Sequence, residues 1–553
     1  MFDEVSMAYV PQVIEAAMFA QEHFICVGDF RQLAPIAQSD AKKHLEKDIF
    51  SYLGVIDGVG NLRYHPWLVM LDEQRRMHPA ISKFPSKRIY DGLLKDHIST
   101  KESRNNIVDL KPFQGEPITL IDLTGTYSLA GKNSDNSRYN ILSATISFLT
   151  AVEAVRNGCN SVGIITPYAA QSRLIQAMIV DHGDGLNEMV TCSTVHQFQG
   201  SERDVIIFDG VESYPSEKPG WLMTRNDNES LLRLINVAVT RARGKLIVVA
   251  DYKYWDDIFK GQGNIFYALL RHIICNGNVV SGTDETFKNY INSIKKTNNI
   301  MKWLDYKSVK DNLYSNISAS KNRIILSLAD SLLIEDKTLF EKLNLQADYG
   351  VLVTGKTHDY KTLDKQWKSK IWSCEEKCFP LLMIDDTYMF YHVPETKGKM
   401  IYKDHQYFVS CNLFFKIKGH TTIEMIKSLT DIEYRYNNGL KMRMDSTPNS
   451  TSPPDNGNNM LSGLALFIYE NKACPKCKNP LLLTKGRSGK SYLKCTNKGC
   501  DHTEILDYQI MNRYIKKNTI TCPKDGGNLK AGVSYKGLYV RCSCGHFIDP
   551  TMI

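Results

Sequence analysis

Half of the cysteines in this chain lie close to its C-terminus, at spacings that suit a metal ion. Seven of the 14 cysteines follow residue 473. Cys474 and Cys477 form a C-x2-C pair, and Cys495 and Cys500 form a C-x4-C pair. Two thiolate pairs on short turns suit tetrahedral coordination of Zn²⁺. The sequence therefore predicts a zinc site at these four residues; the alternative is four free thiols.

A second copy of this pattern follows with altered ligands. Cys522, Asp525, Cys542 and Cys544 repeat the spacing, but Asp525 stands where a cysteine is expected and the closing pair is shortened. Aspartate also ligates zinc, and His546 is nearby. The pattern leaves both possibilities open, a second zinc site and a copy that has lost its metal.

The positive charge of the chain belongs to the same C-terminal region. The net charge is +8. Residues 461–553 carry 15 lysines and arginines against six acidic residues, so the rest of the chain is close to neutral. Tyr492, Lys494, Tyr535, Lys536 and Tyr539 interleave aromatic rings with cations, which suits stacking on single-stranded bases beside phosphate contacts. We expect this tail to bind single-stranded nucleic acid rather than a membrane; the alternative is a solvated basic surface.

A second group of polar side chains precedes a continuous apolar run. In residues 191–209, Gln199, Gly200 and Glu202 lead into the run Val205–Phe208. A continuous apolar run suits a strand that is buried on both faces of a parallel sheet. Glycine lets the backbone approach a ligand closely, while the amide and carboxylate suit a nucleotide sugar or phosphate. The alternative is an ordinary loop at the start of a strand.

Several other apolar segments show the same arrangement and predict the fold class. Strands are expected at residues 23–29, 67–71, 161–168 and 245–251, with helical stretches between them. Apolar strands that alternate with helices indicate an α/β fold with parallel sheets.

The polar motifs around these segments resemble those of the superfamily 1 helicases. DEVS (3–6), GDFRQLAP (28–35), LDEQRRMHP (71–79), TPYAAQ (166–171), VHQFQGSERDVII (195–207) and NVAVTRARGKLIVVAD (236–251) stand in the family's order. They are most similar to the branch that includes the nonsense-mediated-decay helicase, over about residues 1–260. The resemblance implies two RecA-like domains that hold ATP between them and move along a single strand of DNA or RNA, in most of that branch from 5′ to 3′.

The resemblance also implies roles for individual residues. Asp3 resembles the ligand of Mg²⁺, Glu4 the carboxylate that orients the attacking water, and Gln32 the sensor of the γ-phosphate. Arg76 and Arg241 resemble arginine fingers, which neutralise charge that develops in phosphoryl transfer. Matching residues would hold the nucleotide (Gln199, Gly200 and Glu202) or contact the nucleic-acid backbone (Pro167, Tyr168, Gln171 and His196).

Two departures from the family pattern matter. The loop that cradles phosphates in the family, G-x-x-x-x-G-K-[ST], does not occur in residues 1–260, which carry the resemblance; the only match in the chain lies outside that region, at residues 350–357. The first RecA-like domain is therefore incomplete; we favour a fragment, and the alternative is a second polypeptide that supplies the loop. Arg75 occupies the position of a tyrosine that packs on adenine in relatives. A guanidinium plane can stack on a base, but the nucleobase preference is then open.

Residues 306–440 form a further α/β region that resembles a phospholipase-D-like domain. Strand-like runs occur at 323–328, 349–354 and 379–386. An active domain of that family needs His-x-Lys-x4-Asp, yet counting back from Asp385 places Pro380 at the lysine and Cys378 at the histidine. No His-x-Lys occurs anywhere in the chain, so we expect this region to lack nuclease activity. The alternative is an unrelated α/β domain.

These observations divide the chain into six parts. They are the end of the first RecA-like domain (1–66), a second RecA-like domain (67–261), a connector (262–305), the phospholipase-D-like region (306–440), a Ser-, Pro- and Asn-rich linker (441–462) and tandem zinc ribbons (463–553), which resemble those of type IA topoisomerases. The start lacks a signal-peptide pattern and no run of 18 apolar residues occurs, which predicts a cytoplasmic protein.

Two functions from different classes follow. The first is an ATP-dependent helicase that uses ATP, Mg²⁺ and Zn²⁺; joined to a phospholipase-D-like region, it resembles helicases of prokaryotic antiviral defence. The second is a non-catalytic nucleic-acid-binding subunit, a half-motor that needs a partner to supply the missing loop.

Overall fold

The computed structural model of the chain describes residues 1–35, 45–55, 66–224, 229–294, 301–304, 306–328, 341–343, 349–354, 371–374, 379–391, 399–402, 405–408, 413–438, 440–441, 464, 467–468, 472–485, 491–497, 499–505, 508–517, 520–522, 524–534, 537–542 and 544–548. The chain divides into two compact units, Met1–Met444 and Asp445–Ile553. None of the helices in the described ranges is long and apolar enough to cross a membrane.

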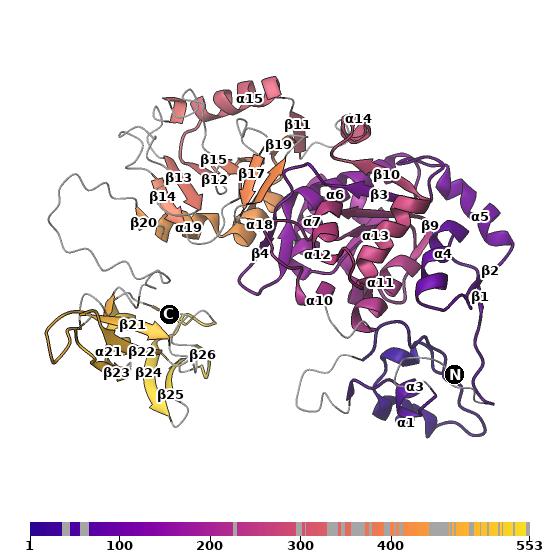
Figure 1. Ribbon diagram of the computed structural model, residues 1–553, viewed down its shortest axis with the longest axis horizontal. Helices are drawn as coiled ribbons and strands as arrows, with labels where there is room; N and C mark the ends of the chain where they lie inside the picture. The colour runs from indigo at the N-terminus through magenta and orange to yellow at the C-terminus, as the bar shows by residue number, and fades with distance from the viewer. Residues whose placement is uncertain are drawn as a thin grey trace. The chain divides into compact units, whose positions relative to one another are not determined.

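A six-stranded parallel sheet is the centre of the first unit (Figure 1). Its strand order is β10-β3-β9-β8-β6-β7, and every neighbouring pair is parallel. The strands are β3 (Ile118–Asp122), β6 (Val162–Thr166), β7 (Val190–Thr194), β8 (Arg203–Asp209), β9 (Ala242–Ala250) and β10 (Asn278–Ser281).

Helices cover both faces of this sheet and explain the continuous apolar runs. On β8, Val205 and Ile207 join the core formed with α6 and α7, whereas Ile206 and Phe208 join the core formed with α4, α11 and α13. The helices around the sheet are α4 (Pro79–Arg88), α5 (Ser99–Val108), α6 (Ile141–Arg156), α7 (Ala169–His182), α8 (Leu186–Met189), α9 (Val195–Phe198), α10 (Trp221–Thr224), α11 (Glu229–Thr240), α12 (Tyr252–Phe259), α13 (Ile265–Asn276) and α14 (Glu285–Ile294). Two short strand pairs, β1 (Glu73–Gln74) with β2 (Lys95–Asp96) and β4 (Ala130–Lys132) with β5 (Arg138–Asn140), complete this part. The expected α/β fold with a parallel sheet is confirmed here.

Two boundaries differ from those expected. The strand predicted at 67–71 is wrong: this stretch has no strand pairing, and Trp67, Val69 and Leu71 are 91%, 80% and 81% exposed. An apolar run becomes a strand only where another strand offers hydrogen bonds. The predicted connector 262–305, in contrast, contains α13, β10 and α14, and β10 pairs with β3 at the edge of the sheet.

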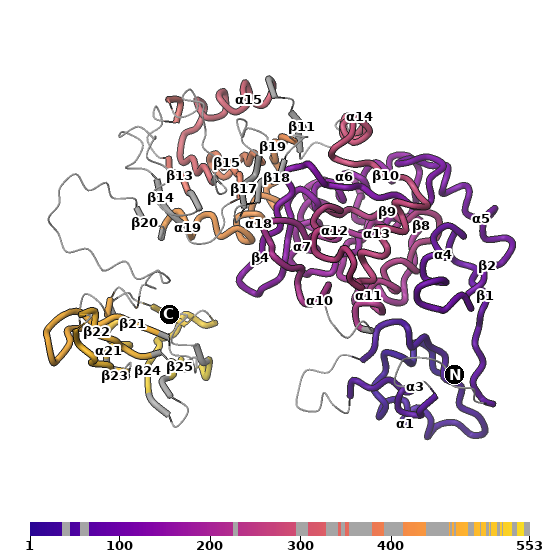
Figure 2. Tube along the Cα trace, in the orientation of Figure 1, coloured from indigo at the N-terminus to yellow at the C-terminus, as the bar shows by residue number. Residues whose placement is uncertain are grey.

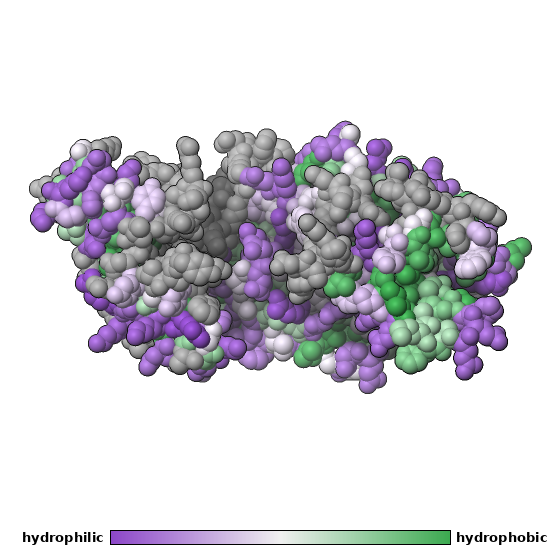
Figure 3. Space-filling view, turned by 90° about the horizontal axis from the view of Figure 1, so that it is seen from below, coloured by the Kyte–Doolittle hydropathy of each residue, from purple (hydrophilic) through white to green (hydrophobic). Residues whose placement is uncertain are grey.

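The N-terminal residues form a small layer beside this sheet. Three short helices form this layer: η1 (Val5–Met7), α1 (Val10–Ala17) and α3 (Ile49–Tyr52). They pack around a small core of Val5, Val10, Val13 and Ile49. The strand expected at 23–29 is reduced to one parallel bridge between Phe2 and Cys26. The space-filling view shows apolar surface gathered at the end of the molecule where Figure 1 places α1 and α3 (Figure 3).

The following region, residues 301–441, builds a mixed eight-stranded sheet of order β11-β19-β16-β15-β12-β13-β14-β20. The expected strands are present as β12 (Ile324–Leu328), β13 (Tyr349–Thr354) and β15 (Leu381–Ile384). The other elements are β11 (Met301–Leu304), α15 (Tyr306–Ser318), β14 (Ile371–Cys374), β16 (Tyr388–Tyr391), β17 (Lys399–Tyr402), β18 (His405–Phe408), β19 (Phe414–Ile417), α18 (His420–Thr430), α19 (Ile432–Asn438) and β20 (Leu440–Lys441).

This second sheet is packed directly against the first rather than tethered to it. One hydrophobic core contains residues from both sheets. Tyr391 donates a hydrogen bond to the backbone oxygen of Tyr127 at 2.7 Å, and the rings of Tyr139 and Phe379 stack with centroids 5.3 Å apart. Asp181, near the end of α7, accepts hydrogen bonds at the start of α18. The continuous course of the chain through both regions can be followed in Figure 2.

The second unit holds two three-stranded sheets with a helix between them in sequence. The first sheet is β21 (Leu481–Lys485), β22 (Ser491–Cys495) and β23 (Thr503–Ile505); the second is β24 (Leu529–Ser534), β25 (Gly537–Cys542) and β26 (Phe547–Ile548). Helix α21 (Tyr508–Lys517) contributes Ile510, Met511 and Tyr514 to one core that both sheets share. The predicted linker 441–462 lies outside the described residues, except for Lys441.

Candidate active site and metal centres

Six of the side chains predicted to act on a nucleotide come together beside the parallel sheet. Arg76 follows β1, Glu202 precedes β8 and Arg241 follows α11, so all three stand at loops of the sheet. Gln32 and Glu4 come from the N-terminal layer; Gln32 accepts a hydrogen bond from Arg241, and Glu4 accepts one from Gln199. Residues more than two hundred positions apart in the sequence therefore share one polar cluster.

Arg241 is at the centre of this cluster. Its side chain is only 1% exposed, and its Nη2 donates to Gln32 Oε1 at 2.7 Å. Gln32 in turn donates from Nε2 to Asp29 Oδ2 at 3.0 Å. Burial, followed by the charge of Arg76, lowers the pKa of Arg241, while Glu4, Tyr90 and Asp29 raise it. The guanidinium is therefore buried beside a second cation, an arrangement that a polyanion would stabilise.

Glu202 is held by two arginines. Arg76 Nε donates to Glu202 Oε2 at 2.5 Å, and Arg243 donates to Glu202 Oε1 at 2.8 Å from Nε and also from Nη2. Partial burial opposes ionisation, but the hydrogen bonds from Arg243 and Arg76 hold the pKa of Glu202 below its ordinary value. Glu202 thus positions Arg76 in this structure, whereas its expected contact with a ribose is a proposal. Sequence reasoning missed Arg243, although it stands two residues after Arg241 in the same motif.

The two N-terminal carboxylates lie at the edge of the cluster. Glu4 has a left-handed backbone with φ of 52°, a conformation that costs a residue other than glycine about 1–3 kcal/mol and is often kept at functional sites. Gln199 donates from Nε2 to Glu4 Oε2 at 3.4 Å, while the Gln199 oxygen Oε1 is buried with no partner among the described residues. Asp3 is exposed and accepts from the backbone nitrogen of Glu4 at 2.9 Å.

The guanidinium groups of Arg76 and Arg241 suit the phosphate oxygens of a nucleoside triphosphate, and the carboxylates of Asp3 and Glu4 suit its Mg²⁺. The Gln199 oxygen would accept from a donor such as a water bound to that ion. Gly200 has φ of 77° and open space around its Cα, as a close approach of ligand to backbone requires. Arg75 is exposed and pairs with Glu73 at 2.9 Å.

A hydrogen-bonded bridge that sequence reasoning missed ties the N-terminal layer to the sheet. Tyr90 donates to Asp29 Oδ2 at 2.5 Å, and Asn236 donates from Nδ2 to Tyr90 Oη at 2.7 Å. Asn236 also donates to the backbone oxygen of Arg31 at 3.0 Å. Asn236 lies in a recognised motif, but nothing in the sequence around Tyr90 indicates this role.

The residues predicted to contact nucleic acid divide into two groups. Gln171 is completely buried, and its Nε2 donates to Asp209 Oδ2 at 2.7 Å and to Ser143 Oγ at 2.9 Å. Tyr168 is 6% exposed and donates to the buried Glu212. This burial contradicts the predicted contact of Gln171 with a nucleic-acid strand, because the Gln171 amide forms its hydrogen bonds inside the domain. Pro167 is also buried, whereas His196 is half-buried in α9, ahead of β8.

The four cysteines of the first predicted zinc site are assembled. The four sulfurs lie within 4.8 Å of one another. The Sγ atoms of Cys474 and Cys500 are 3.7 Å apart, and those of Cys477 and Cys495 are 3.3 Å apart. Tetrahedral Zn²⁺ with Zn–S bonds of 2.3 Å needs sulfurs about 3.8 Å apart, so the residues fit the ion.

The altered second copy is assembled in the same way. Cys522, Asp525, Cys542 and Cys544 each offer a ligand atom within 4.8 Å of the others. A hydrogen bond from the backbone nitrogen of Gly527, together with Cys522 and Cys542, lowers the pKa of Asp525 to about 2. Asp525 therefore stands as a charged carboxylate in the position of the missing thiolate. His546 is not a member of this group.

Asp385, the aspartate aligned with the nuclease motif, has a structural role in the second sheet. It accepts hydrogen bonds from the backbone nitrogens of Lys321, Asn322 and Arg323 at 2.8–3.0 Å and from Ser320 Oγ at 2.6 Å. These contacts stabilise the turn before β12. The aligned position 378 lies outside the described residues, and Pro380 offers no side-chain donor.

Comparison with known proteins gives matches over the part of the chain that holds the parallel sheet. Residues 62–253 match the AAA domain family. The chain is 29% identical over 254 residues to Helicase sen1 of Schizosaccharomyces pombe, a match that covers 45% of this chain and 14% of that protein. It is 28% identical over 304 residues to ATP-dependent helicase upf1 of the same organism, covering 54% of this chain and 30% of that protein.

The matched region therefore spans less than a third of the length of either relative. Among solved structures, PRRSV helicase aligns at 13% identity over 53% of this chain and 48% of that chain, with a TM-score of 0.23 that is too low to establish a shared fold. The helicase-related part of the resemblance is confirmed by the domain match and the two relatives. The phospholipase-D-like and zinc-ribbon parts stay predictions.

Proposed function

We propose that this chain is the C-terminal portion of an ATP-dependent superfamily 1 helicase that moves on single-stranded nucleic acid. The observation that carries the proposal is the polar cluster of Glu4, Gln32, Arg76, Gln199 and Arg241. Its residues come from distant segments, and they supply the cations and carboxylates that phosphoryl transfer from ATP requires.

The proposed roles follow from the contacts. ATP with Mg²⁺ supplies the phosphoryl group and the charge that organises its oxygens. Asp3 would hold the metal, Glu4 would orient a water, and Gln32 would read the terminal phosphate. Arg241 already donates a hydrogen bond to Gln32 Oε1, so a movement of either side chain would displace the other. Arg76, positioned by Glu202, would neutralise charge on the transferred group.

The proposal includes a second polypeptide segment that covers the N-terminal layer and brings a phosphate-binding loop. Several large apolar side chains of this layer are at least half exposed: Ile14, Met18, Phe19, Ile25, Tyr52 and Leu53. Apolar surface gathered on one side marks an interaction site more often than free surface. The occupant would be either an adjoining part of the same protein or a partner subunit.

The test combines the chain, in cis or in trans, with a segment that carries the loop. We expect ATP hydrolysis that single-stranded nucleic acid stimulates, and its loss in Glu4→Gln. Hydrolysis that persists in both Glu4→Gln and Arg241→Ala would exclude the proposed site.

The competing candidate is a non-catalytic nucleic-acid-binding subunit. The charge of residues 461–553 and the absence of G-x-x-x-x-G-K-[ST] from residues 1–260 favour it. It predicts strand binding without strand-stimulated hydrolysis in the same experiment.

For the second unit we propose two zinc ions and single-strand binding. Both ligand groups are assembled, and Lys494 and Tyr539 stand on strands of the two sheets. Because cations displace counterions from phosphates, binding should weaken steeply with salt; stacking tolerates any base, so sequence preference should be small. Salt-independent binding would contradict the electrostatic part. For residues 306–440 we propose a phospholipase-D-like fold without phosphodiesterase activity.

A further inference from the structure

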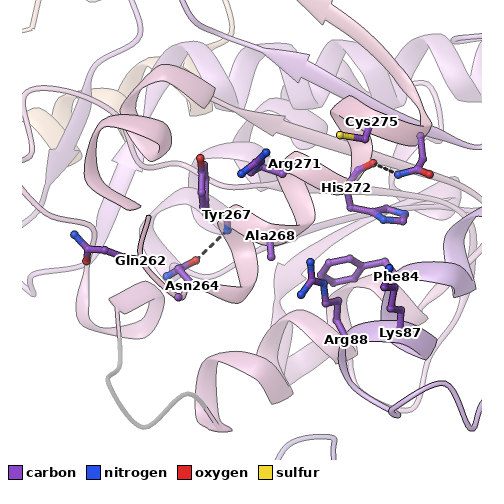
Figure 4. A pocket seen from close by; sticks show the side chains of 12 residues that line it. Phe84, Lys87, Arg88, Gln262, Asn264, Tyr267, Ala268, Arg271, His272 and Cys275 are labelled. Carbon is purple, nitrogen blue, oxygen red and sulfur yellow. Dashed lines mark hydrogen bonds between the residues drawn. The ribbon is translucent and has the colours of Figure 1, made fainter. Parts of the chain in front are cut away.

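A cationic hollow is lined mainly by residues of helices α4 and α13 (Figure 4). Its volume is about 510 Å³, within the range of about 300–1,000 Å³ that is usual for small-ligand sites. Phe84, Lys87 and Arg88 of α4 and Tyr267, Arg271 and His272 of α13 line it. Helix α4 begins next to Arg76 and ends at this hollow, about 15 Å further along its axis at 1.5 Å per residue. The lining of the hollow includes none of the residues of the polar cluster.

The floor of the hollow is aromatic and well packed. Phe84 is 1% exposed, and its ring centroid is 5.4 Å from that of His272. Tyr267 is 5% exposed and is held at both ends, by Asn264 Oδ1 on its backbone nitrogen at 3.0 Å and by Asp256 Oδ1 on its hydroxyl at 2.6 Å. The walls are therefore fixed before any ligand arrives.

The rim carries cations without acidic partners. No carboxylate lines the hollow, and within the described ranges Lys87, Arg88 and Arg271 form no ion pair shorter than 4 Å. Lys83 lies alongside and donates to Asn276 Oδ1 at 3.2 Å. The dipole of α4 accounts for Lys87 and Arg88 in its last turn, but not for Arg271 in the middle of α13.

His272 is a half-buried residue of the lining that feels the surrounding cations. Its Nε2 is buried and has no hydrogen-bond partner among the described residues. Burial lowers the pKa of His272, and the charges of Lys83, Arg88 and Lys87 lower it further; no carboxylate opposes them. An anion bound in the hollow would raise this pKa again.

We propose that this hollow binds a nucleotide unit, with its phosphate among Lys87, Arg88 and Arg271 and its base or sugar against the Tyr267 side. Guanidinium groups suit phosphate because they offer paired donors in one plane, and the parts of Phe84 and Tyr267 that line the hollow give a base or sugar an apolar contact. The unit can belong to a single strand or to a free mononucleotide, which share this chemistry. The proposal does not rest on ATP hydrolysis, because no residue of the polar cluster takes part.

Cys275 allows a test in the full chain. It lines the hollow and its thiol is exposed, so its reaction with N-ethylmaleimide can be followed by peptide mass mapping. We expect a single-stranded oligonucleotide, or adenosine monophosphate at matched nucleotide concentration, to slow labelling of Cys275 about fivefold or more. Labelling of Cys26, outside the hollow, is the internal reference. Protection by the oligonucleotide alone assigns the site to a strand, and protection by the mononucleotide alone assigns it to free nucleotide; either result supports the proposal.

Variants separate specific binding from general charge. Lys87 and Arg271 are exposed, so Lys87→Glu with Arg271→Glu should leave the fold intact, as circular dichroism would show. The double variant should raise the half-protecting ligand concentration about tenfold or more, since charged hydrogen bonds are worth this much. The matched control is Lys132→Glu, which reverses one exposed cation on β4 and should change nothing. Unchanged labelling with both ligands, or equal protection in wild type and the folded double variant, would overturn the proposal.

Discussion

Removal of the Asp181 carboxylate should loosen the junction between the two large sheets. Its oxygens accept from the backbone nitrogens of Thr421 and Thr422 at 3.0 and 2.6 Å and from Thr422 Oγ1 at 2.7 Å, all in the first turn of α18. Asp181 thus caps a helix from another part of the chain.

The magnitude follows from known capping energies. Loss of an N-cap side chain costs about 0.5–2 kcal/mol, and an anion at a helix N-terminus adds about 0.3–1 kcal/mol. We therefore expect Asp181→Ala to lower the free energy of unfolding by about 1–3 kcal/mol, and Asp181→Asn by less, because an amide oxygen can still accept.

The effect should depend on pH in a defined direction. Although burial opposes ionisation, the hydrogen bonds from Thr422 and Thr421 lower the pKa of Asp181. A lowered folded-state pKa stabilises the protein above the unfolded value of about 3.9, and this stability is lost as the pH falls through the folded pKa. The difference between wild type and Asp181→Ala should then be largest near neutrality and smaller in acid.

The assay is urea unfolding at several pH values together with hydrogen exchange of residues 420–430. The matched control is Asp184→Asn, which removes a nearby carboxylate for which no contact with α18 is seen in the described chain. An unchanged urea midpoint with unchanged exchange in α18 would refute the reasoning, because it would mean that the cap contributes nothing to the junction.

Four further outcomes are expected. The 553-residue chain alone should not hydrolyse ATP, because its helicase-like region, residues 1–260, has no G-x-x-x-x-G-K-[ST]; measurable strand-stimulated turnover would contradict this. In the completed protein, Arg241→Ala should slow turnover by about 10³-fold, the lower end for an arginine finger, in a steady-state assay. Cys495→Ser should unfold the first ribbon, seen as loss of one zinc equivalent in metal analysis and of β21–β23 protection, since metal binding supplies folding energy in so small a unit. Burial raises the pKa of Asp209 to about 6, so its contribution to stability is present below about pH 4 and lost as the pH rises through 6. In thermal unfolding, Asp209→Asn should therefore weaken the fall of stability between pH 4 and 6. An unchanged pH dependence would contradict this role of Asp209.

The sequence was sufficient to predict those features that depend on residues close together in the chain. Cysteine spacing predicted the first ligand group and left the second open; both are assembled, because ligands on short turns must lie close in space. The apolar run at 205–208 predicted a strand buried on both faces, because only a two-sided core requires every side chain to be apolar. The order of the motifs indicated which residues would meet at the polar cluster.

Tertiary structure decided what depends on partners far away in the chain. The run at 67–71 has strand composition but no strand to pair with, whereas 278–281 became an edge strand because β3 was available. Gln171 was predicted to face a ligand, yet Asp209 and Ser143 hold it inside the domain. No periodicity or motif in the sequence indicates the hydrogen bonds of Tyr90, Arg243 and Asp181. The same is true of the cationic hollow between α4 and α13. These features form because packing brings together segments that are far apart in the sequence and share no recognisable pattern.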